Sequence, residues 1–325
     1  MYSWHSYDLS DIILIVLKNG GELKLLPKHI ENVIVPPIKC QGIKTKLVNF
    51  IANNVVWDGE GRWIEPFLGS GVVLFNIQPE RALISDKNEH IINFYKGIQS
   101  GYINPISARE FLEYHGERLN SIGEDYYYQM RDEFNEAKDP LHFLFLSRAC
   151  FNGVMRFSKK GKFNVPFCKK PDRFRPAYVT KIVNQIDKVS RAMLGRDWVF
   201  QACDWRETIQ QAAEGDFIYI DPPYIGRSTG YIGDWEQDEA NELAQYARTS
   251  PAGFALSMWK QNKYRVNTHI EEAWGGLEMR EFNHFYHVGS SEDLRNAMIE
   301  ALIIKDGYYT EQPVQAEEVS VDEDD

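Results

Sequence analysis

The tetrapeptide from Asp221 to Tyr224 combines groups that could do chemistry on a planar ligand. Its consecutive prolines, Pro222 and Pro223, fix two φ angles and remove two N–H donors, so the backbone offers carbonyl acceptors in a rigid frame. Asp221 adds a carboxylate, and Tyr224 adds a flat aromatic face. Acceptors beside a stacking surface suit a ligand that carries an amino group. An ordinary stop between a strand and a loop is the alternative interpretation, because Asp and Pro are common turn residues.

The apolar run before the tetrapeptide predicts its position in a fold. Residues Phe217 to Ile220 are β-branched or aromatic, and a proline stop bounds them, which is typical of a buried strand. Open α/β sheets bind their ligands at the carboxyl ends of strands. We therefore expect Asp221 to lie at such an edge.

Earlier strand ends supply further acidic residues. The first predicted strand, 63–67, contains Glu65. The second, 81–85, is followed directly by Asp86, and the third, 199–202, leads to Asp204 and Trp205. An acidic residue at the tip of the second strand is where α/β nucleotide sites bind ribose hydroxyls, although a lone Asp is also a common helix cap. The turn from Leu68 to Gly71 lets a ligand approach the backbone closely through Gly69 and Gly71. The third glycine of the dinucleotide fingerprint is missing, so no pyrophosphate cradle is predicted.

Composition limits the class of protein. A chain of 325 residues can bury a large core, and its length suggests one large domain with a smaller inserted or appended one. No apolar run approaches a membrane span, and no signal peptide is recognisable, so we expect a cytoplasmic protein. The four cysteines have no close paired spacing, which indicates neither a zinc site nor a disulfide framework; they are Cys40, Cys150, Cys168 and Cys203.

Charge is distributed unevenly along the chain. The formal net charge is −11, from 36 Lys and Arg against 47 Asp and Glu. Thirteen of the basic residues but only two of the acidic ones lie between Arg148 and Arg196, which leaves 23 basic and 45 acidic residues elsewhere. A basic segment on an acidic protein indicates a local contact with nucleic acid.

The start of this basic segment predicts a hairpin. Asn152-Gly153 and Lys160-Gly161 are turn signals, and the residues around them alternate in character up to Phe167. Cations neutralise phosphates, whereas Arg can read base edges. A solvated charged loop is the alternative interpretation.

Helical spacing and polar stretches complete the predicted organisation. We expect helices within 45–55, 72–76, 89–146, 176–194 and 237–247, strands at 254–258, 279–285 and 300–306, and a loop at 225–235 that could fold over a ligand. The predicted domains are an N-terminal extension (1–35), a catalytic domain (36–100 and 197–310), an inserted DNA-binding domain (101–196) and a disordered tail (311–325). The tail carries seven acidic residues and no basic ones.

The order of these elements, from about Pro37 to Asp306, resembles the Dam-like adenine-specific DNA methyltransferases. The segment 65–71 is similar to that family's cofactor loop, 42–44 to its N-terminal cofactor motif, and 221–224 to its catalytic motif. The segments 151–153 and 163–167 are similar to its target-recognition hairpin. The resemblance implies an α/β, Rossmann-like methyltransferase fold with a mixed seven-stranded sheet and helices on both faces. It also implies an inserted, mostly helical DNA-recognition domain with a hairpin loop.

The resemblance implies S-adenosylmethionine as cofactor and assigns residues to it. Lys44 would lie near the methionine end, the turn at 65–71 under the cofactor, Asp86 at the ribose hydroxyls, and Asp204 with Trp205 by the cofactor adenine. The implied cofactor residues are Cys40, Lys44, Glu65, Pro66, Phe67, Gly69, Gly71, Asp86, Asp204, Trp205 and Asp221, and the implied catalytic residues are Asp221, Pro222, Pro223 and Tyr224. Cys40 departs from the family, which often has an aromatic residue there. No metal is required by this chemistry.

The implied partner is double-stranded DNA, from which the target adenine is flipped, and GATC is the expected recognition sequence. The candidates for base-edge contacts are Lys39, Val154, Arg156 and Pro166, with Asn152 beside them. The residues expected to bind phosphates are Lys159, Lys160, Lys162, Lys169 and Lys170. A cognate restriction endonuclease is a conceivable further partner.

Two other functions stay open at this point. The same acceptors could serve a methyltransferase that acts on a cytosine amine or on RNA. A nucleic-acid-binding protein with a vestigial methyltransferase fold is the alternative from a different class, and saturable cofactor binding without turnover would favour it.

Overall fold

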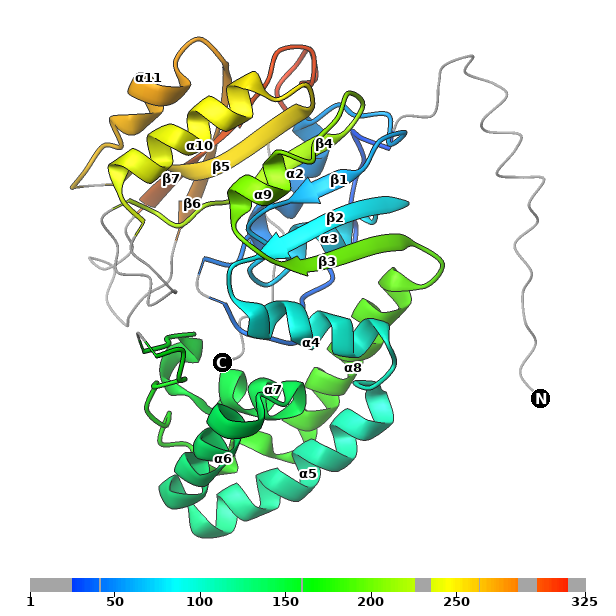
Figure 1. Ribbon diagram of the computed structural model, residues 1–325, viewed down its shortest axis with the longest axis vertical. Helices are drawn as coiled ribbons and strands as arrows, with labels where there is room; N and C mark the ends of the chain where they lie inside the picture. The colour runs from blue at the N-terminus through cyan, green and yellow to red at the C-terminus, as the bar shows by residue number, and fades with distance from the viewer. Residues whose placement is uncertain are drawn as a thin grey trace.

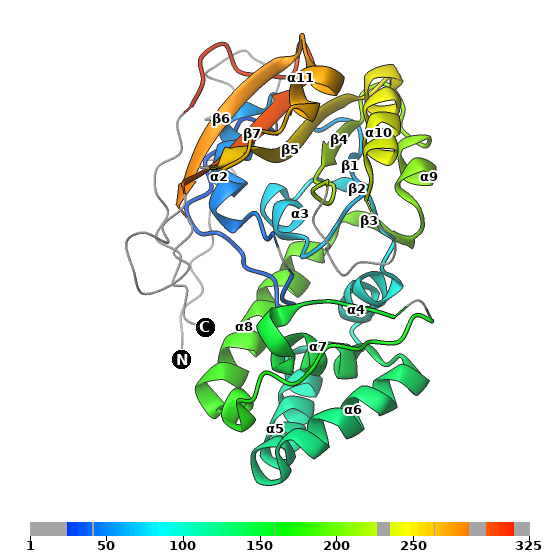
Figure 2. The same ribbon diagram turned by 90° about the vertical axis from the view of Figure 1, so that its left-hand side faces the viewer.

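The computed structural model describes residues 25–40, 42–158, 160–225, 235–262, 264–285 and 297–314. Two lobes are visible: a sheet flanked by helices, and below it a bundle of helices α5 to α8 (Figure 1). Helix α4 lies where the two lobes meet, and α8 returns the chain from the bundle to the sheet (Figures 1 and 2).

The sheet has seven strands in the order β3-β2-β1-β4-β5-β7-β6, with β7 antiparallel to both of its neighbours and the other pairs parallel. The mixed seven-stranded α/β fold expected from the sequence is confirmed. The strands are β1 (Trp63–Glu65), β2 (Arg81–Asp86), β3 (Asp197–Ala202), β4 (Phe217–Ile220), β5 (Gly253–Asn262), β6 (Glu278–Phe285) and β7 (Ala297–Ile304).

Helices cover both faces of the sheet, because alternate strand residues enter two separate hydrophobic cores. In β4, Phe217 and Tyr219 belong to one core and Ile218 and Ile220 to the other. The first core packs on α2 (Val48–Asn54), α3 (Val72–Ile77) and α4 (Glu89–Gln99). The second packs on α9 (Trp205–Ile209), α10 (Gln237–Thr249) and α11 (His269–Trp274). An unbroken apolar run therefore becomes a central strand.

The helical lobe consists of α5 (Pro105–Ile122), α6 (Glu124–Ala137), α7 (Pro140–Ala149) and α8 (Pro176–Met193). The sequence predicted helix throughout 89–146, but local signals divide that stretch. The side chains of Asn104 and Asp139 cap the first turns of α5 and α7, each with a proline directly after it. Gly123, at φ 81°, separates α5 from α6.

Parts of the predicted extension and tail pack on the sheet lobe. The side chain of Asn49 bonds to the backbone of Ile30, and that of Asn76 bonds to the backbone of Ile34. Asn54 bonds to the backbone of Val314. Residues 25–35 and 311–314 are therefore held against the sheet lobe. The rest of the predicted extension and tail, and positions 226–234 of the predicted loop, lie outside the described residues.

Within the described ranges, no helix is both long and apolar enough to cross a membrane.

Candidate active site

The predicted acidic residues follow four neighbouring parallel strands. Asp204, Asp86, Glu65 and Asp221 come at the carboxyl ends of β3, β2, β1 and β4, which lie side by side in that order. From β1 the chain continues to β2 on one side, and from β4 it continues to β5 on the other side. Glu65 and Asp221 therefore flank the switch point, where the strand order reverses and where such sheets bind ligands. Asp86, Asp204 and Asp221, which the sequence placed at strand ends, therefore lie at one edge of the sheet. Glu65 was predicted within a strand at 63–67, but β1 ends at Glu65, directly before Pro66, which has no N–H to donate to a neighbouring strand.

Asp221 is oriented by an ion pair and a hydrogen bond, both to the same one of its two carboxylate oxygens. Lys44 Nζ lies 2.9 Å from Oδ1, and Ser257 Oγ donates to the same oxygen at 3.2 Å. Ser257 is itself held by the Tyr219 hydroxyl at 2.8 Å. Among the described residues no hydrogen bond reaches Oδ2, and the Asp221 side chain is 23% exposed. One oxygen is thus occupied by the protein and the other is available to a ligand.

Lys44 is buried among acidic groups. Burial alone would lower its pKa, but Asp221, Tyr224 and Glu300 raise the pKa of Lys44 well above its ordinary value, so the side chain is an ammonium. The resemblance placed Lys44 near the methionine end of the cofactor; here its ammonium pairs with Asp221, and the role at the cofactor stays a prediction.

Glu300 is a site residue that the sequence reasoning missed. It lies in β7, and both of its carboxylate oxygens accept from the Tyr224 hydroxyl, at 2.9 and 3.0 Å. The signal in the sequence is a single acidic residue within the otherwise apolar run from Ala297 to Ile304.

The two predicted turn glycines serve different purposes. Gly69, at φ 53°, faces open space, since a Cβ there would meet nothing within 4 Å. Its N–H donates to Asp86 Oδ2 at 2.9 Å. Gly71, at φ 74°, begins α3, and a Cβ there would lie 2.6 Å from the Phe75 ring. Gly69 therefore leaves room for a ligand, whereas Gly71 is required by helix packing.

Asp86 and Glu65 are buried carboxylates with raised pKa values. Burial raises the pKa of Asp86 to about 6, against hydrogen bonds from the Asn88 and Gly69 amides. Burial also raises the pKa of Glu65 to about 8, against a hydrogen bond from the Trp63 indole, and Asp221 raises it further. Two desolvated acids at adjacent strand ends are typical of a functional site.

We expect Glu65→Gln to stabilise the unliganded protein progressively as pH rises. A folded pKa near 8 against about 4.5 unfolded means that the wild-type contribution is present below pH 4.5 and is lost as pH rises through 8. The loss is about 1.4 kcal/mol per pH unit at most. In urea denaturation between pH 5 and 9, the free energy of unfolding of the variant, relative to that of the wild type, should increase with pH up to about pH 8. Glu60→Gln, at an exposed position, is the control, and parallel profiles for wild type and Glu65→Gln would contradict the expectation.

Aromatic side chains line the β3 side of the site. The ring of Phe67 stacks on Trp205 at a centroid distance of 6.3 Å and meets Trp235 edge-on at 5.5 Å. Trp205 is buried, and its indole N–H donates to Glu239 at 3.2 Å. Trp235 is a neighbour that the sequence did not assign to the site.

Asp204 acts as a helix cap in this structure. Its Oδ1 accepts from the Arg206 amide at the start of α9 and pairs with the Arg206 guanidinium, both at 3.0 Å. Its predicted place beside the cofactor adenine stays a prediction.

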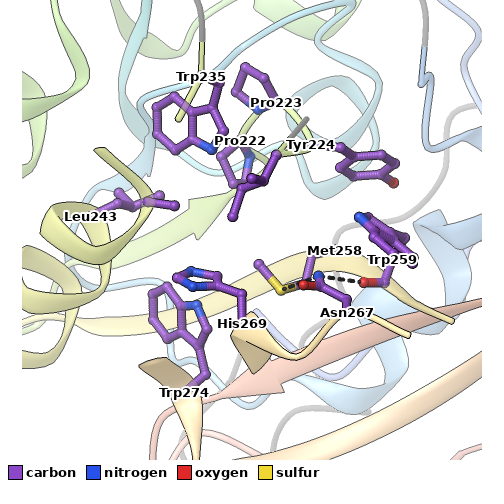
Figure 3. Close-up of a pocket in the computed structure, with 12 residues that line it drawn as sticks. Pro222, Pro223, Tyr224, Trp235, Leu243, Met258, Trp259, Asn267, His269 and Trp274 are labelled. Atoms are coloured by element: carbon purple, nitrogen blue, oxygen red, sulfur yellow. Dashed lines mark hydrogen bonds between the residues drawn. The ribbon is translucent and has the colours of Figure 1, made fainter. Parts of the chain in front are cut away.

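A pocket lies against the tetrapeptide on the side of α10 and α11 (Figure 3). Pro222, Pro223 and Trp235 lie along one side, and His269 and Trp274 lie opposite. Its further lining residues are Tyr224, Ile225, Ala240, Leu243, Met258, Trp259 and Asn267. These aromatic and apolar side chains surround one side of the rigid Pro-Pro segment.

Residues 39 and 40 lie between Asp86 and the hairpin. Cys40 Sγ is 3.9 Å from Met155 Sδ, and burial together with the nearby Asp86 raises the pKa of the Cys40 thiol. A Cβ on Gly153 would lie 2.9 Å from Cβ of Lys39. The hairpin and the predicted cofactor site are thus in direct contact through this segment.

The predicted hairpin is present. Antiparallel bridges join Cys150 to Phe167 and Phe157 to Phe163, although no continuous strand forms between them. Burial alternates along both arms: the buried side chains are Met155, Phe157, Phe163, Val165 and Phe167, and the exposed or half-buried ones are Asn152, Val154, Arg156, Lys162, Asn164 and Pro166. The predicted DNA-binding residues of the two arms therefore share one outward face.

The predicted cations of the hairpin differ in their exposure and contacts. Lys160 is exposed at the tip, Lys39 is half-buried at the base, and Lys159 lies outside the described residues. Arg156 is exposed, and Asn164 receives its guanidinium through two hydrogen bonds, Nε to Oδ1 at 2.9 Å and Nη2 to the backbone oxygen at 3.0 Å. Asn164 was not among the predicted site residues.

Not every cation of the basic segment is exposed to a DNA partner, and Arg148 is an example. Its side chain is buried and donates to the Pro37 carbonyl and to Gln185, both at 2.5 Å. Arg173 in turn donates to the Arg148 carbonyl at 2.7 Å. These two arginines of the segment tie the helical lobe together.

Across the described ranges, no three His, Cys, Asp or Glu side chains are grouped so that they could hold a metal ion.

Comparison with known proteins decides the family. Residues 41–288 match the family of D12 class N6 adenine-specific DNA methyltransferases. The chain belongs to this family. It is therefore an adenine-specific DNA methyltransferase, as the resemblance predicted, and the alternatives of a cytosine or RNA substrate and of a purely binding role are set aside. Membership implies a methyl donor.

Its relatives include enzymes with different biological settings. A DNA adenine methylase of Haemophilus influenzae is 30% identical over 243 residues, covering 71% of this chain and 77% of the relative. A Type II methyltransferase of Lactococcus lactis subsp. cremoris is 30% identical over 211 residues, covering 62% and 70%. A Type II methyltransferase of Methanocaldococcus jannaschii is 30% identical over 263 residues, covering 72% and 86%.

Proposed function

We propose that this methyltransferase uses S-adenosylmethionine to methylate the exocyclic amine of an adenine flipped out of duplex DNA. The observation that carries the proposal is the one-sided binding of Asp221: Lys44 and Ser257 occupy Oδ1, and no hydrogen bond from a described residue reaches Oδ2. The next residue in the chain, Pro222, carries the second acceptor, its carbonyl. This pair of acceptors lies at the switch point of the sheet.

The chemistry of the amine explains why these acceptors matter. The lone pair of the exocyclic nitrogen is delocalised into the adenine ring, which makes it a poor nucleophile. Hydrogen bonds from the amine to Asp221 and to the Pro222 carbonyl favour a pyramidal nitrogen with a localised lone pair. Since that nitrogen is paired within a duplex, the base must be flipped out, and Tyr224 offers a face on which it stacks. Positioning and fixed acceptors supply the catalysis.

The residues at the strand ends fit a sulfonium nucleoside. When bound, S-adenosylmethionine supplies a methyl group on a cationic sulfur, to which the acidic strand ends are electrostatically suited. The open space over Gly69 admits the ligand to the backbone, and the adjacent Asp86 carboxylate would accept from the ribose hydroxyls. The half-buried ring of Phe67, which stacks on the buried Trp205, offers an aromatic surface to the cofactor adenine.

We expect cofactor affinity to fall as pH is lowered through about 6, because Asp86 accepts ribose hydroxyls only as a carboxylate. Hydrogen bonds to a charged group contribute about 1.5–3 kcal/mol, so Asp86→Asn should weaken binding at pH 7.5 by about tenfold or more and remove most of the pH dependence. Calorimetric titration with S-adenosylmethionine between pH 5.5 and 8 measures both effects. A wild-type affinity that stays constant across this range would contradict the assignment of Asp86.

For DNA, we propose that the outward face of the hairpin contacts the duplex and that the lysines at its tip bind phosphates. Arg156 and Val154 lie on that face, with Asn152 and Pro166 beside them. GATC is the proposed recognition sequence. The Type II methyltransferases among the relatives support a cognate restriction endonuclease as a cellular partner of this chain.

The test is single-molecule, methylation-sensitive sequencing of DNA from cells that express the chain, with cells that express Asp221→Ala as the control. Methyladenine in one short sequence, absent from the control, supports the proposal and identifies the target. Unmodified DNA, together with a folded protein that binds the cofactor, would overturn it.

A further inference from the structure

A buried carboxylate in β7 has no part in the proposed chemistry as stated so far. Glu300 is 1% exposed and lies between strands β5 and β6, opposite Trp259 and Phe282. A charge at such a depth is costly unless it is paired and hydrogen-bonded. Its two oxygens share the Tyr224 hydroxyl, so one of its partners is the last residue of the catalytic tetrapeptide.

Tyr224 connects Glu300 to the ammonium that orients Asp221. Lys44 Nζ lies 3.3 Å from the Tyr224 hydroxyl and 5.2 Å from the centre of its ring. The same ammonium lies 2.9 Å from Asp221 Oδ1. A continuous path of polar contacts thus runs from Glu300 through Tyr224 and Lys44 to Asp221, and its members come from three separate parts of the chain.

The path determines which Asp221 oxygen meets the substrate. Lys44 and Ser257 both bind Oδ1, which turns Oδ2 toward the site. If Lys44 were displaced, its ammonium could approach either oxygen and compete with the target amine. Tyr224 limits this movement together with the Gly42 carbonyl, because Lys44 Nζ lies 3.3 Å from each of them, and Glu300 fixes the Tyr224 hydroxyl from behind.

The charges of Lys44, Asp221 and Glu300 support the same role for Glu300. Lys44 carries one positive charge beside the carboxylates of Asp221 and Glu300. Without the second carboxylate, Asp221 alone would neutralise the ammonium and its oxygens would become weaker acceptors. With it, Asp221 keeps negative charge for the amine.

We propose that Glu300 is a positioning residue that acts through Tyr224 and Lys44 to direct Asp221 Oδ2 at the target adenine amine. The inference rests on the proposed function and adds to it a residue outside the catalytic tetrapeptide. It also assigns the Tyr224 hydroxyl a task separate from that of its ring.

The experiment is a double-mutant cycle on the full-length protein, with Glu300→Gln, Tyr224→Phe and the combined variant. Single-turnover methylation of duplex DNA at saturating cofactor measures the chemical step. Fluorescence of 2-aminopurine at the target position measures base flipping, and thermal unfolding measures stability. Glu281→Gln is the matched control, because Glu281 is also an acidic strand residue in an ion pair, with Lys260, but lies outside the path.

We expect Glu300→Gln and Tyr224→Phe each to slow the chemical step by about tenfold or more, with flipping retained and Glu281→Gln unaffected. The combined variant should be no slower than the slower single variant, because both changes interrupt one path. A wild-type rate for Glu300→Gln, or losses that multiply in the combined variant, would overturn the inference.

The test also separates failure of this inference from misfolding of a variant and from failure of the proposed function. If Glu300→Gln does not fold, Tyr224→Phe decides alone, since the ring is retained and a wild-type rate would overturn the inference. If the wild type itself methylates no adenine, the proposed function fails; if the wild type and Glu281→Gln methylate normally and only the expected losses are missing, the inference alone fails.

Discussion

Replacement of Asp221 by Ala is expected to reduce methyl transfer to about a thousandth of the wild-type rate or less, while cofactor affinity changes by no more than about threefold. The amine would lose its carboxylate acceptor, and its lone pair would stay delocalised. The site would not be left with an unpaired buried charge, because the Lys44 ammonium is also close to Tyr224 and the Glu300 carboxylate. The variant should therefore fold.

Asp221→Asn separates acceptor chemistry from shape, since it keeps the size of the side chain. It should be nearly as inactive, because an amide is a weaker acceptor than a carboxylate. Single-turnover transfer of a labelled methyl group measures the rate, and calorimetry measures cofactor binding. Asp216→Asn is the control: Asp216 pairs with Arg62 at 2.7 Å before β4, so its loss should lower stability and spare the chemical step. Near-full turnover in Asp221→Ala would contradict its catalytic assignment.

The acidic strand ends could be predicted because local sequence determines them. Phe217 to Ile220 forms a strand buried on both faces, and such strands are unbroken apolar runs. The prolines that follow stop the strand and leave Asp221 at its tip. The same reasoning placed Asp86, whereas Glu65 was expected within a strand at 63–67 and instead ends β1. The parallel pairing of β2, β1 and β4 brings the three together.

Glu300 could not be predicted, because its partner is defined only by the sheet topology. Strand β7 inserts between β5 and β6, and this order brings Glu300 to Tyr224, 76 positions earlier in the chain. Trp235 similarly reaches Phe67 only through the packing of the second core. Residues joined by such long-range contacts carry no local signal apart from a polar group in an apolar run.

Arg148 illustrates the opposite error. By charge alone it belonged to the predicted DNA-binding segment, yet its guanidinium binds the Pro37 carbonyl, 111 positions away, and Gln185. The sequence reports charge but not depth, so a basic segment mixes surface cations with buried structural ones. The alternation along the hairpin was a better guide, because it predicts which side chains share a face.

The two kinds of cation on the hairpin lead to the last prediction. Arg156→Ala should relax specificity at one base pair, because an Arg that reads a base edge contributes about 1–3 kcal/mol of discrimination, a factor of about 5 to 150. Lys160→Ala should weaken binding to all DNA sequences similarly and lower the salt slope by about 1. Methylation rates on duplexes with each single substitution in the target, measured at several salt concentrations, give both quantities.

The hydrogen bonds of Arg156 provide the decisive control. Asn164 fixes its guanidinium through two contacts, so a base-reading Arg156 should depend on that support, whereas a phosphate contact tolerates a loose side chain. Asn164→Ala should therefore relax specificity at the same base pair as Arg156→Ala, by a smaller factor, and leave the salt slope unchanged. If Arg156→Ala and Lys160→Ala instead affect all sequences alike, Arg156 binds the backbone, and base recognition must lie with other side chains on the outward face of the hairpin.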